Sequence, residues 1–174
     1  MSKKETIRKK READLAGLYE EYYPKVSRYI FIRIGNQQEA EDLASETFVR
    51  ALASLDSYEE RGSPLAAWLF RIAHNIVVDY VRKMSKRPTV TLEEVTIADS
   101  SNPEEVVEID IQTERLAQAM EHLTPAQREI LGLRFFSDLS AVDTGKILGK
   151  KPGAVREMQR AAISTLRMAM GSQS

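Results

Sequence analysis

The sequence predicts an all-α protein of two small helical domains joined by a flexible acidic linker, and three observations lead to this prediction. Apolar residues recur every three or four positions through most of the chain, which is the spacing of helices with one buried face. No run shows the apolar and polar alternation of a strand bounded by turns. Residues 88–108 lack the helical spacing and instead hold two prolines, turn formers and acidic side chains. We therefore expect a basic N-terminal tail at 1–11, helical domains at 12–87 and 109–171, and a linker at 88–108.

The first domain is expected to begin with two helices. Apolar residues form a helical stripe over residues 15–34, and Pro24 within the stripe should kink or divide this helix. Asn36 and Glu39 have the spacing of a capping box, in which two side chains satisfy free backbone N–H groups at a helix start. A second helix with one apolar face is therefore expected over residues 37–55.

A third helix should complete this domain. Ser63 and Pro64 predict a side-chain cap followed by proline at the first helical position, and the helix should continue to about Lys83. Its apolar residues share an inner face. Its outer face carries a polar stripe of Arg71, Asn75, Asp79, Arg82 and Lys86.

The second domain should begin with a helix that runs from near Glu108 to Leu123. Thr124 and Gln127 then form a second capping-box pattern, with proline between them at the first helical turn. This pattern predicts a helix over residues 125–136.

The end of the chain has the pattern of a helix-turn-helix motif. Ser140 and Asp143 predict the capped start of a short helix that ends near Gly149, and a final helix should follow Pro152. Gly145 falls where the two helices should cross closely. A residue without a Cβ atom is useful there, although glycine costs a helix about 1 kcal/mol.

The net charge of −1 and the sequence pI of about 6.2 do not suggest nucleic-acid binding, for which a pI above about 9 is usual. The charge is unevenly distributed, however. Residues 1–87 hold 16 basic and 13 acidic residues, residues 88–115 hold 1 and 8, and residues 116–174 hold 8 and 5. Two mildly basic domains therefore flank a strongly acidic linker.

Several classes of function are excluded by residue type. The chain has no cysteine, no pair of histidines at metal-binding spacing and no glycine-rich phosphate loop, so we expect no enzyme, no metal and no cofactor. His74 and His122 are expected to be structural or surface residues. Asp42 and Glu46 lie one helical turn apart, which indicates a solvated or partner-binding face rather than an acid and base pair. No segment is apolar enough for a signal peptide or a membrane span, so we expect a cytoplasmic protein.

Duplex DNA binding is favoured for the helix-turn-helix motif. If the final helix enters the major groove by its N-terminal end, lysines in the turn can reach phosphates, and arginines one turn apart can approach base edges or backbone. A glutamate beside them could accept a hydrogen bond from a cytosine amino group. The alternative is an ordinary solvated basic helix end. The candidate residues are Lys150, Lys151, Arg156, Glu157 and Arg160.

At four places the sequence resembles the bacterial extracytoplasmic-function (group 4) RNA polymerase sigma factors. The residues that carry the resemblance are Tyr22-Tyr23-Pro24 and the segments 40–52 (AEDLASETFVRAL), 64–82 (PLAAWLFRIAHNIVVDYVR) and 123–131 (LTPAQREIL). They occur in the family's order, and the resemblance spans about residues 14–87 and 109–168. The resemblance implies sigma domain 2, a bundle of three or four helices, followed by sigma domain 4, a helix-turn-helix domain.

The resemblance implies roles for surfaces already identified. Domain 2 of the family docks on the clamp helices of the largest subunit of core RNA polymerase through the position of Asp42, Glu46 and Arg50. An acidic face suits a basic coiled coil, although the same residues could form an ordinary solvated face. Domain 2 also captures the melted minus-10 strand, which requires stacking of a base and cationic backbone contacts. The implied minus-10 residues are Tyr58, Arg61, Arg71, Asn75, Asp79, Arg82 and Lys83.

The final helix corresponds to the family's reader of the minus-35 element. The sequence departs from the family at Ser45, often a glutamine, at Lys150, often apolar, and at Ala161, often an arginine, so Arg160 could replace the last of these. Trp68 is expected to pack among apolar neighbours rather than to stack on DNA. The acidic linker could thread a basic cleft of the polymerase, or it could be a polar tether.

The prediction is therefore an alternative sigma factor that binds core RNA polymerase and directs promoter-specific transcription initiation, for example in a stress response, with promoter DNA and an anti-sigma factor as further partners. Two alternatives remain open. One is a stand-alone helix-turn-helix regulator whose first domain dimerises or senses a signal. The other is a helical adaptor without a nucleic-acid role.

Overall fold

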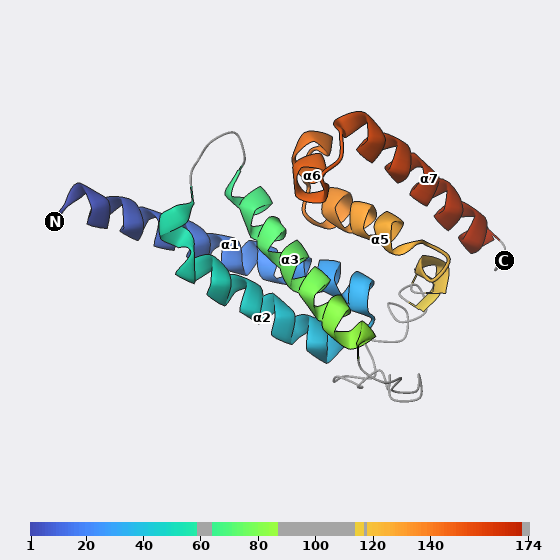
Figure 1. Cartoon of the computed structure of the whole chain (residues 1–174), viewed down its shortest axis with the longest axis horizontal. Helices are drawn as coiled ribbons and strands as arrows, with labels where there is room; N and C mark the ends of the chain where they lie inside the picture. Colours follow the sequence, from blue (N-terminus) through green and yellow to red (C-terminus); the bar gives the residue numbers. More distant parts are fainter. Residues whose placement is uncertain (59–63, 87–113, 117, 172–174) are drawn as a thin grey trace.

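The computed structural model describes residues 1–58, 64–86, 114–116 and 118–171, and every regular element within these ranges is helical (Figure 1). The all-α prediction is therefore confirmed for this part of the chain. The linker prediction at 88–108 and the candidate Arg61 lie outside the described residues, as does the predicted start of a helix near Glu108.

The first domain consists of α1 (Lys3–Ile34), α2 (Gln37–Ala53), a short 3-10 turn, η1 (Leu55–Ser57), and α3 (Leu65–Ser85). The Asn36 side chain caps α2 as predicted, because its Oδ1 accepts a hydrogen bond of 3.0 Å from the backbone N–H of Glu39. Apolar faces of the three long helices meet in one core. Its largest fully buried side chains in this domain are Tyr29, Phe70, Ile30, Leu69, Val26 and Val77.

Two local expectations for this domain were wrong in detail, and for Pro24 one of the two expected effects is excluded. Residues 3–11, expected as a tail, are the first turns of α1, which starts at a capping box of Ser2 and Glu5. Pro24 does not divide α1, which continues through it. At the start of α3, Pro64 is the N-cap residue rather than the first helical residue, and it provides no side-chain cap.

The second domain contains α5 (Pro125–Leu131), a π-helical turn, η3 (Gly132–Phe136), α6 (Ala141–Leu148) and α7 (Pro152–Gly171), with helical residues before them at 114–116 and 118–120. The capping box of Thr124 and Gln127 forms in both directions. The Ser140 hydroxyl accepts from the N–H of Asp143 at 3.0 Å. Local side-chain chemistry therefore starts α5 and α6 where the sequence predicted.

Gly145 shows why the helix-turn-helix motif needs glycine. A Cβ atom at this position would lie 2.3 Å from the carbonyl oxygen of Lys150 and 3.6 Å from Val155 Cγ2. The prediction of a close approach is confirmed, but the nearest neighbour is the backbone of the turn rather than the second helix. The N–H of Lys150 donates to the Gly145 carbonyl at 2.8 Å and fixes this approach.

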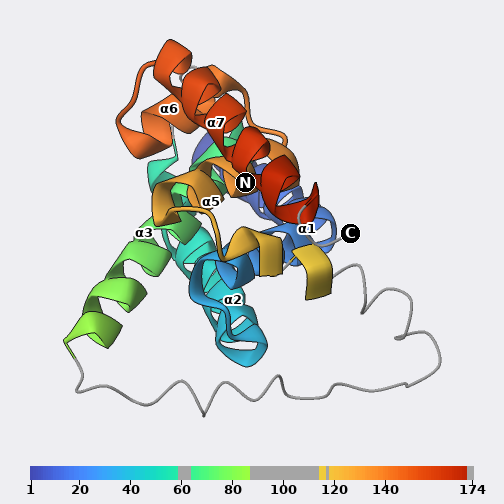
Figure 2. The ribbon, with the colours of Figure 1, turned by 90° about the vertical axis from the view of Figure 1, so that its right-hand side faces the viewer.

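The two domains pack against each other (Figure 2). Leu133 and Leu139 of the second domain are buried in the same apolar cluster as the core of the first, and Ile147 and Leu148 of α6 pack against it. The separate core of the second domain is small, with Leu123, Leu131 and Ala162 at its centre. The second domain therefore shares part of its apolar surface with α1 and α3.

Candidate nucleic-acid and polymerase interfaces

The N-terminal half of α7 presents a basic surface. Val155 and Ala162 anchor the inner side of this helix in the core, which turns Arg156 and Arg160 outward. The two lysines of the preceding turn, Lys150 and Lys151, are exposed as well. Glu157 lies 3.7 Å from Arg160 in an ion pair whose side chains are 71% and 80% exposed, so the pair contributes little stability and can open for a ligand.

An open groove of about 740 Å³ continues this surface along α7. Four arginines surround it, and Ile163 and Met168 form its apolar part. A surface of this composition suits a phosphate backbone, because a guanidinium group can donate two parallel hydrogen bonds to phosphate oxygens in a bidentate geometry. The groove is lined by Arg134, Arg156, Gln159, Arg160, Ile163, Ser164, Arg167 and Met168.

Most residues of this groove, Arg134 and Gln159 among them, were not candidates in the sequence. Arg134 Nε donates to Gln159 Oε1 at 2.8 Å, and Arg134 Nη1 donates to the carbonyl of Leu139 at 2.5 Å. The arginine thus ties α7 to the segment that precedes α6 and fixes the amide of Gln159 with its oxygen toward the protein. Arg134 lies 25 residues before Gln159, so no spacing rule within one helix could have connected them.

The polar stripe of α3 is present as predicted from its spacing. Arg71, Asn75, Arg82 and Lys86 are exposed along the helix, and Asp79 is half-buried. The neighbouring candidate Lys83 is exposed as well. The structure therefore presents cationic side chains on one surface of the first domain, which is what contact with a nucleic-acid backbone requires.

Tyr58 is placed differently from a free stacking residue. Its side chain is 7% exposed, its ring centroid lies 5.2 Å from that of Trp68, and the Arg11 guanidinium carbon lies 5.7 Å from the ring centroid. Trp68 is half-buried against the core, as expected. In this structure the Tyr58 ring packs within the protein, so its use as a base platform would require it to leave Trp68.

The acidic face of α2 points away from the core. Asp42 is exposed, and the Glu46 carboxylate forms an ion pair of 2.5 Å with Arg50 one turn later. These two side chains are 43% and 48% exposed. The face is therefore accessible to a partner, and its ion pair is of the solvent-screened kind that contributes little to folding.

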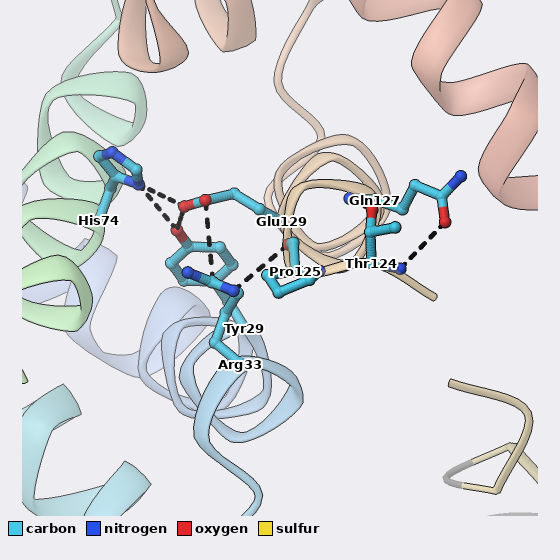
Figure 3. A network of polar contacts seen from close by, with 7 residues as sticks. All are labelled: Tyr29, Arg33, His74, Thr124, Pro125, Gln127 and Glu129. Atoms are coloured by element: carbon cyan, nitrogen blue, oxygen red, sulfur yellow. Dashed lines mark hydrogen bonds and ion pairs between the residues drawn. The ribbon is translucent and has the colours of Figure 1, made fainter. Parts of the chain in front are cut away.

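A polar network between the domains was not predicted. Glu129 of α5 is 7% exposed, and its Oε1 accepts a hydrogen bond of 2.7 Å from the Tyr29 hydroxyl of α1 (Figure 3). The same oxygen forms a short contact with Nδ1 of His74 on α3, and Oε2 lies 3.7 Å from Arg33 Nε. Arg33 also donates from Nη1 to the carbonyl of Pro125 at 3.3 Å. One carboxylate of the second domain therefore meets two hydrogen-bonding side chains and one cation of the first.

The pKa of this carboxyl reflects its partners. Burial raises the pKa of Glu129, but the hydrogen bond and charge of His74, the hydroxyl of Tyr29 and the charge of Arg33 outweigh burial and hold the pKa below 4.5. Burial also raises the pKa of Tyr29 well above 10, and the Glu129 carboxylate adds to this shift. At neutral pH the Tyr29 hydroxyl therefore keeps its proton and donates a hydrogen bond to the ionised Glu129 carboxylate.

The described residues offer no metal centre and no membrane span. No group of three or more histidine, cysteine, aspartate or glutamate side chains in the described ranges is arranged to hold a metal ion. None of the helices described has the length and apolar character needed to cross a membrane.

Comparisons with known proteins identify the family. Residues 18–87 match the family described as Sigma-70 region 2, and residues 119–168 match Sigma-70, region 4. The ECF RNA polymerase sigma factor SigD of Mycobacterium tuberculosis is 35% identical over 151 residues, which are 83% of this chain and 71% of that protein. The chain belongs to the ECF RNA polymerase sigma factors.

Other sigma factors resemble this one in sequence. The RNA polymerase sigma factor YlaC of Bacillus subtilis is 31% identical over 80% of this chain and 82% of that protein. The ECF RNA polymerase sigma factor BldN of Streptomyces coelicolor is 39% identical over 89% of this chain, but the match spans 60% of BldN.

The fold of this sigma factor also matches a solved structure of the family. RpoE from Bartonella quintana, solved with the anti-sigma factor NepR, superposes with a TM-score of 0.73 at 25% identity over 91% of this chain and 97% of that chain. The predicted family and the two sigma domains are therefore confirmed. The roles of individual residues stay predictions.

Proposed function

We propose that this sigma factor binds core RNA polymerase and directs promoter-specific initiation through two DNA contacts. Domain 2, residues 12–87 together with the helical extension before it, would bind the polymerase and the melted minus-10 element. Domain 4, residues 109–171, would read the minus-35 element as duplex DNA, and residues 88–108 would join them. Membership of the sigma family carries this proposal, and the outward basic surface of α7 in a helix-turn-helix motif supports it.

For the minus-35 contact, α7 would enter the major groove by its N-terminal end. Lys150 and Lys151 would bind phosphates, and Arg156, Glu157 and Arg160 would lie at the base edges. In such a complex the Arg134 contact would hold the amide oxygen of Gln159 inward and leave its amino group for an acceptor. Both weak DNA contacts act on one polymerase complex, so neither domain needs high affinity alone.

For the polymerase contact, we propose the exposed α2 face of Asp42, Glu46 and Arg50 against the basic clamp helices of the largest subunit. The α3 residues Arg71, Asn75, Asp79, Arg82 and Lys83 would follow the minus-10 strand, together with Arg61 and Tyr58 from the loop before α3. Tyr58 would have to leave Trp68 for this role. The protein would act in the cytoplasm, where an anti-sigma factor would restrain it. The structure of the relative RpoE in complex with the anti-sigma factor NepR supports such a partner.

The test separates this function from that of a stand-alone regulator. Core RNA polymerase reconstituted with the purified protein should initiate at promoters recovered by selection from a random library, whereas the protein without polymerase should not bind the same duplexes tightly as a dimer. Failure to bind core polymerase, with tight binding to a palindromic duplex, would instead indicate a stand-alone helix-turn-helix regulator.

A further inference from the structure

In the packed arrangement of the two domains, the two proposed DNA-binding surfaces lie too close together to reach both promoter elements. The α3 stripe and the α7 surface are separated by α6, which packs against both α3 and α7. Two helix packing steps of about 8–10 Å each place the two surfaces about 20 Å apart. Elements at minus-10 and minus-35 are about 25 base pairs apart, on the order of 80 Å of duplex at about 3.4 Å per pair. The domains must therefore separate when both elements are read.

The contact between Glu129 and His74 also adjoins the proposed minus-10 surface. His74 follows Arg71 by three residues and precedes Asn75 by one, so it borders the outer stripe of α3. The second domain covers His74, whose side chain is 16% exposed. A domain docked at this place limits the approach of a DNA strand to the same face of α3.

The docking is specific in shape as well as in charge. A Cβ atom at Gly132, the first residue of η3, would lie 2.7 Å from Cδ2 of Tyr29, and the Tyr29 ring is fully buried against Phe70 with centroids 5.8 Å apart. Gly132 has ordinary helical backbone angles, φ −58° and ψ −49°, so conformation does not require glycine here. The close approach of the other domain does.

The docked state also contains an unfavourable group, which keeps it reversible. Arg33 Nε is buried and has no hydrogen-bond acceptor among the described residues, because the Glu129 carboxylate lies 3.7 Å away. Leaving a buried donor without an acceptor is costly. Separation of the domains returns this guanidinium group to water.

We propose that Tyr29, Arg33 and His74 form a carboxylate-binding docking site on domain 2 for Glu129 of domain 4, and that this docked state is the resting form of the free protein, which must open before a promoter is read. The necessity of opening for function rests on the proposed sigma activity. The docking itself does not. Core polymerase would bind the open form, so docking would raise its apparent Kd by the inverse of the fraction of molecules that are open.

Two variants weaken the docked state alone. Glu129→Ala removes the carboxylate from its three partners, and in an open form residue 129 would be a solvated helical position that accepts alanine. Gly132→Ala places a methyl group against Tyr29 in the docked state and suits the helix when the domains are apart. The matched controls are Glu121→Ala, at an exposed carboxylate of the same domain, and Gly17→Ala, where nothing lies within 4 Å of the added Cβ atom.

The natural absence of cysteine allows the opening to be measured directly. Donor and acceptor dyes on Glu20→Cys of α1 and Met170→Cys of α7, both exposed positions, report the distance between the domains in the full chain. We expect high transfer in the free protein and a loss of transfer on binding core polymerase. Glu129→Ala and Gly132→Ala should each raise the ratio of open to closed molecules about tenfold or more, because each disrupts a buried interdomain contact. The two controls should leave this ratio unchanged.

Core binding provides the second readout. If the closed form dominates, Glu129→Ala and Gly132→Ala should tighten the apparent Kd for core polymerase by up to the same factor. Circular dichroism confirms that each variant is folded. Unchanged transfer in both folded variants would overturn the docking proposal even if core binding is normal. If the wild-type chain does not bind core polymerase, the sigma proposal fails, while the transfer measurement on the free chain still decides whether Glu129 holds the domains together.

Discussion

Replacement of Gly145 by alanine tests the helix-turn-helix geometry most sharply. The added Cβ atom would lie 2.3 Å from the Lys150 carbonyl oxygen, closer than such atoms occur in proteins, and this oxygen belongs to backbone that cannot rotate away. The turn between α6 and α7 would therefore shift, and the hydrogen bond of 2.8 Å from the Lys150 N–H to the Gly145 carbonyl would be strained. Residues of the proposed DNA surface follow directly after this turn.

The expected cost follows from three contributions. Overpacking of a tight contact costs about 1–3 kcal/mol, and a weakened backbone hydrogen bond adds about 1 kcal/mol. Alanine recovers roughly 1 kcal/mol, because it is the better helix former. We therefore expect Gly145→Ala to destabilise domain 4 by about 1–3 kcal/mol, which corresponds to a fall in Tm on the order of 5 °C.

Thermal unfolding followed by circular dichroism measures this loss, with Gly153→Ala as the control. Gly153 lies in the first turn of α7, and a Cβ atom there would meet nothing within 4 Å. The control should be as stable as the natural protein or slightly more stable. If Gly145→Ala proves as stable as Gly153→Ala, the close approach of α6 to the turn is not a feature of the folded protein.

Three further predictions concern promoter discrimination, the pH dependence of stability and the affinity for core polymerase. Arg156→Ala should lower discrimination between promoters by about 1–3 kcal/mol in binding titrations if the arginine reads a base, whereas an equal loss on every sequence would identify a phosphate contact. The pKa of Glu129 is lower in the folded protein than its ordinary 4.5, so its contribution to stability is complete above that pH and disappears as the pH falls through the lower, folded value. Unfolding curves of the natural protein and of Glu129→Gln should therefore differ at neutral pH and converge in acid; a constant difference would contradict the assigned shift. Glu46→Lys should weaken binding to core polymerase in a salt-dependent way, measured by competition, and unchanged affinity would show that the α2 face is only solvated.

Local chemistry explains which parts of the fold could be predicted from the sequence. The caps at Asn36, Thr124 and Ser140 depend on residues three positions away, so they were visible in the sequence and are confirmed. Pro24 was expected to kink or divide α1, because proline removes one helical hydrogen bond, yet the helix is stabilised by the packing of its apolar face and continues. The sequence alone does not show whether the lost hydrogen bond or the packing of the apolar face has the larger effect.

The unpredicted part of the site depends on contacts between distant residues. His74 and Glu129 lie 55 residues apart, with the linker between them, and neither has a local pattern that distinguishes it from a surface residue. The burial of Tyr58 likewise depends on the contact of this residue, just after η1, with Trp68 in the first turn of α3. The exposed basic face of α7 agrees with its helical spacing, but its use as a DNA reader stays a prediction.

On the proposed function, the chain gives core RNA polymerase its promoter specificity through both domains. The decisive measurement is transcription in a reconstituted system with core polymerase, the purified protein and a promoter obtained by selection. We predict transcripts from one start site that depend on the protein, and loss of these transcripts when either the minus-35 or the minus-10 element is scrambled. Transcription that is unaffected by the protein, or that survives loss of either element, would contradict the claim.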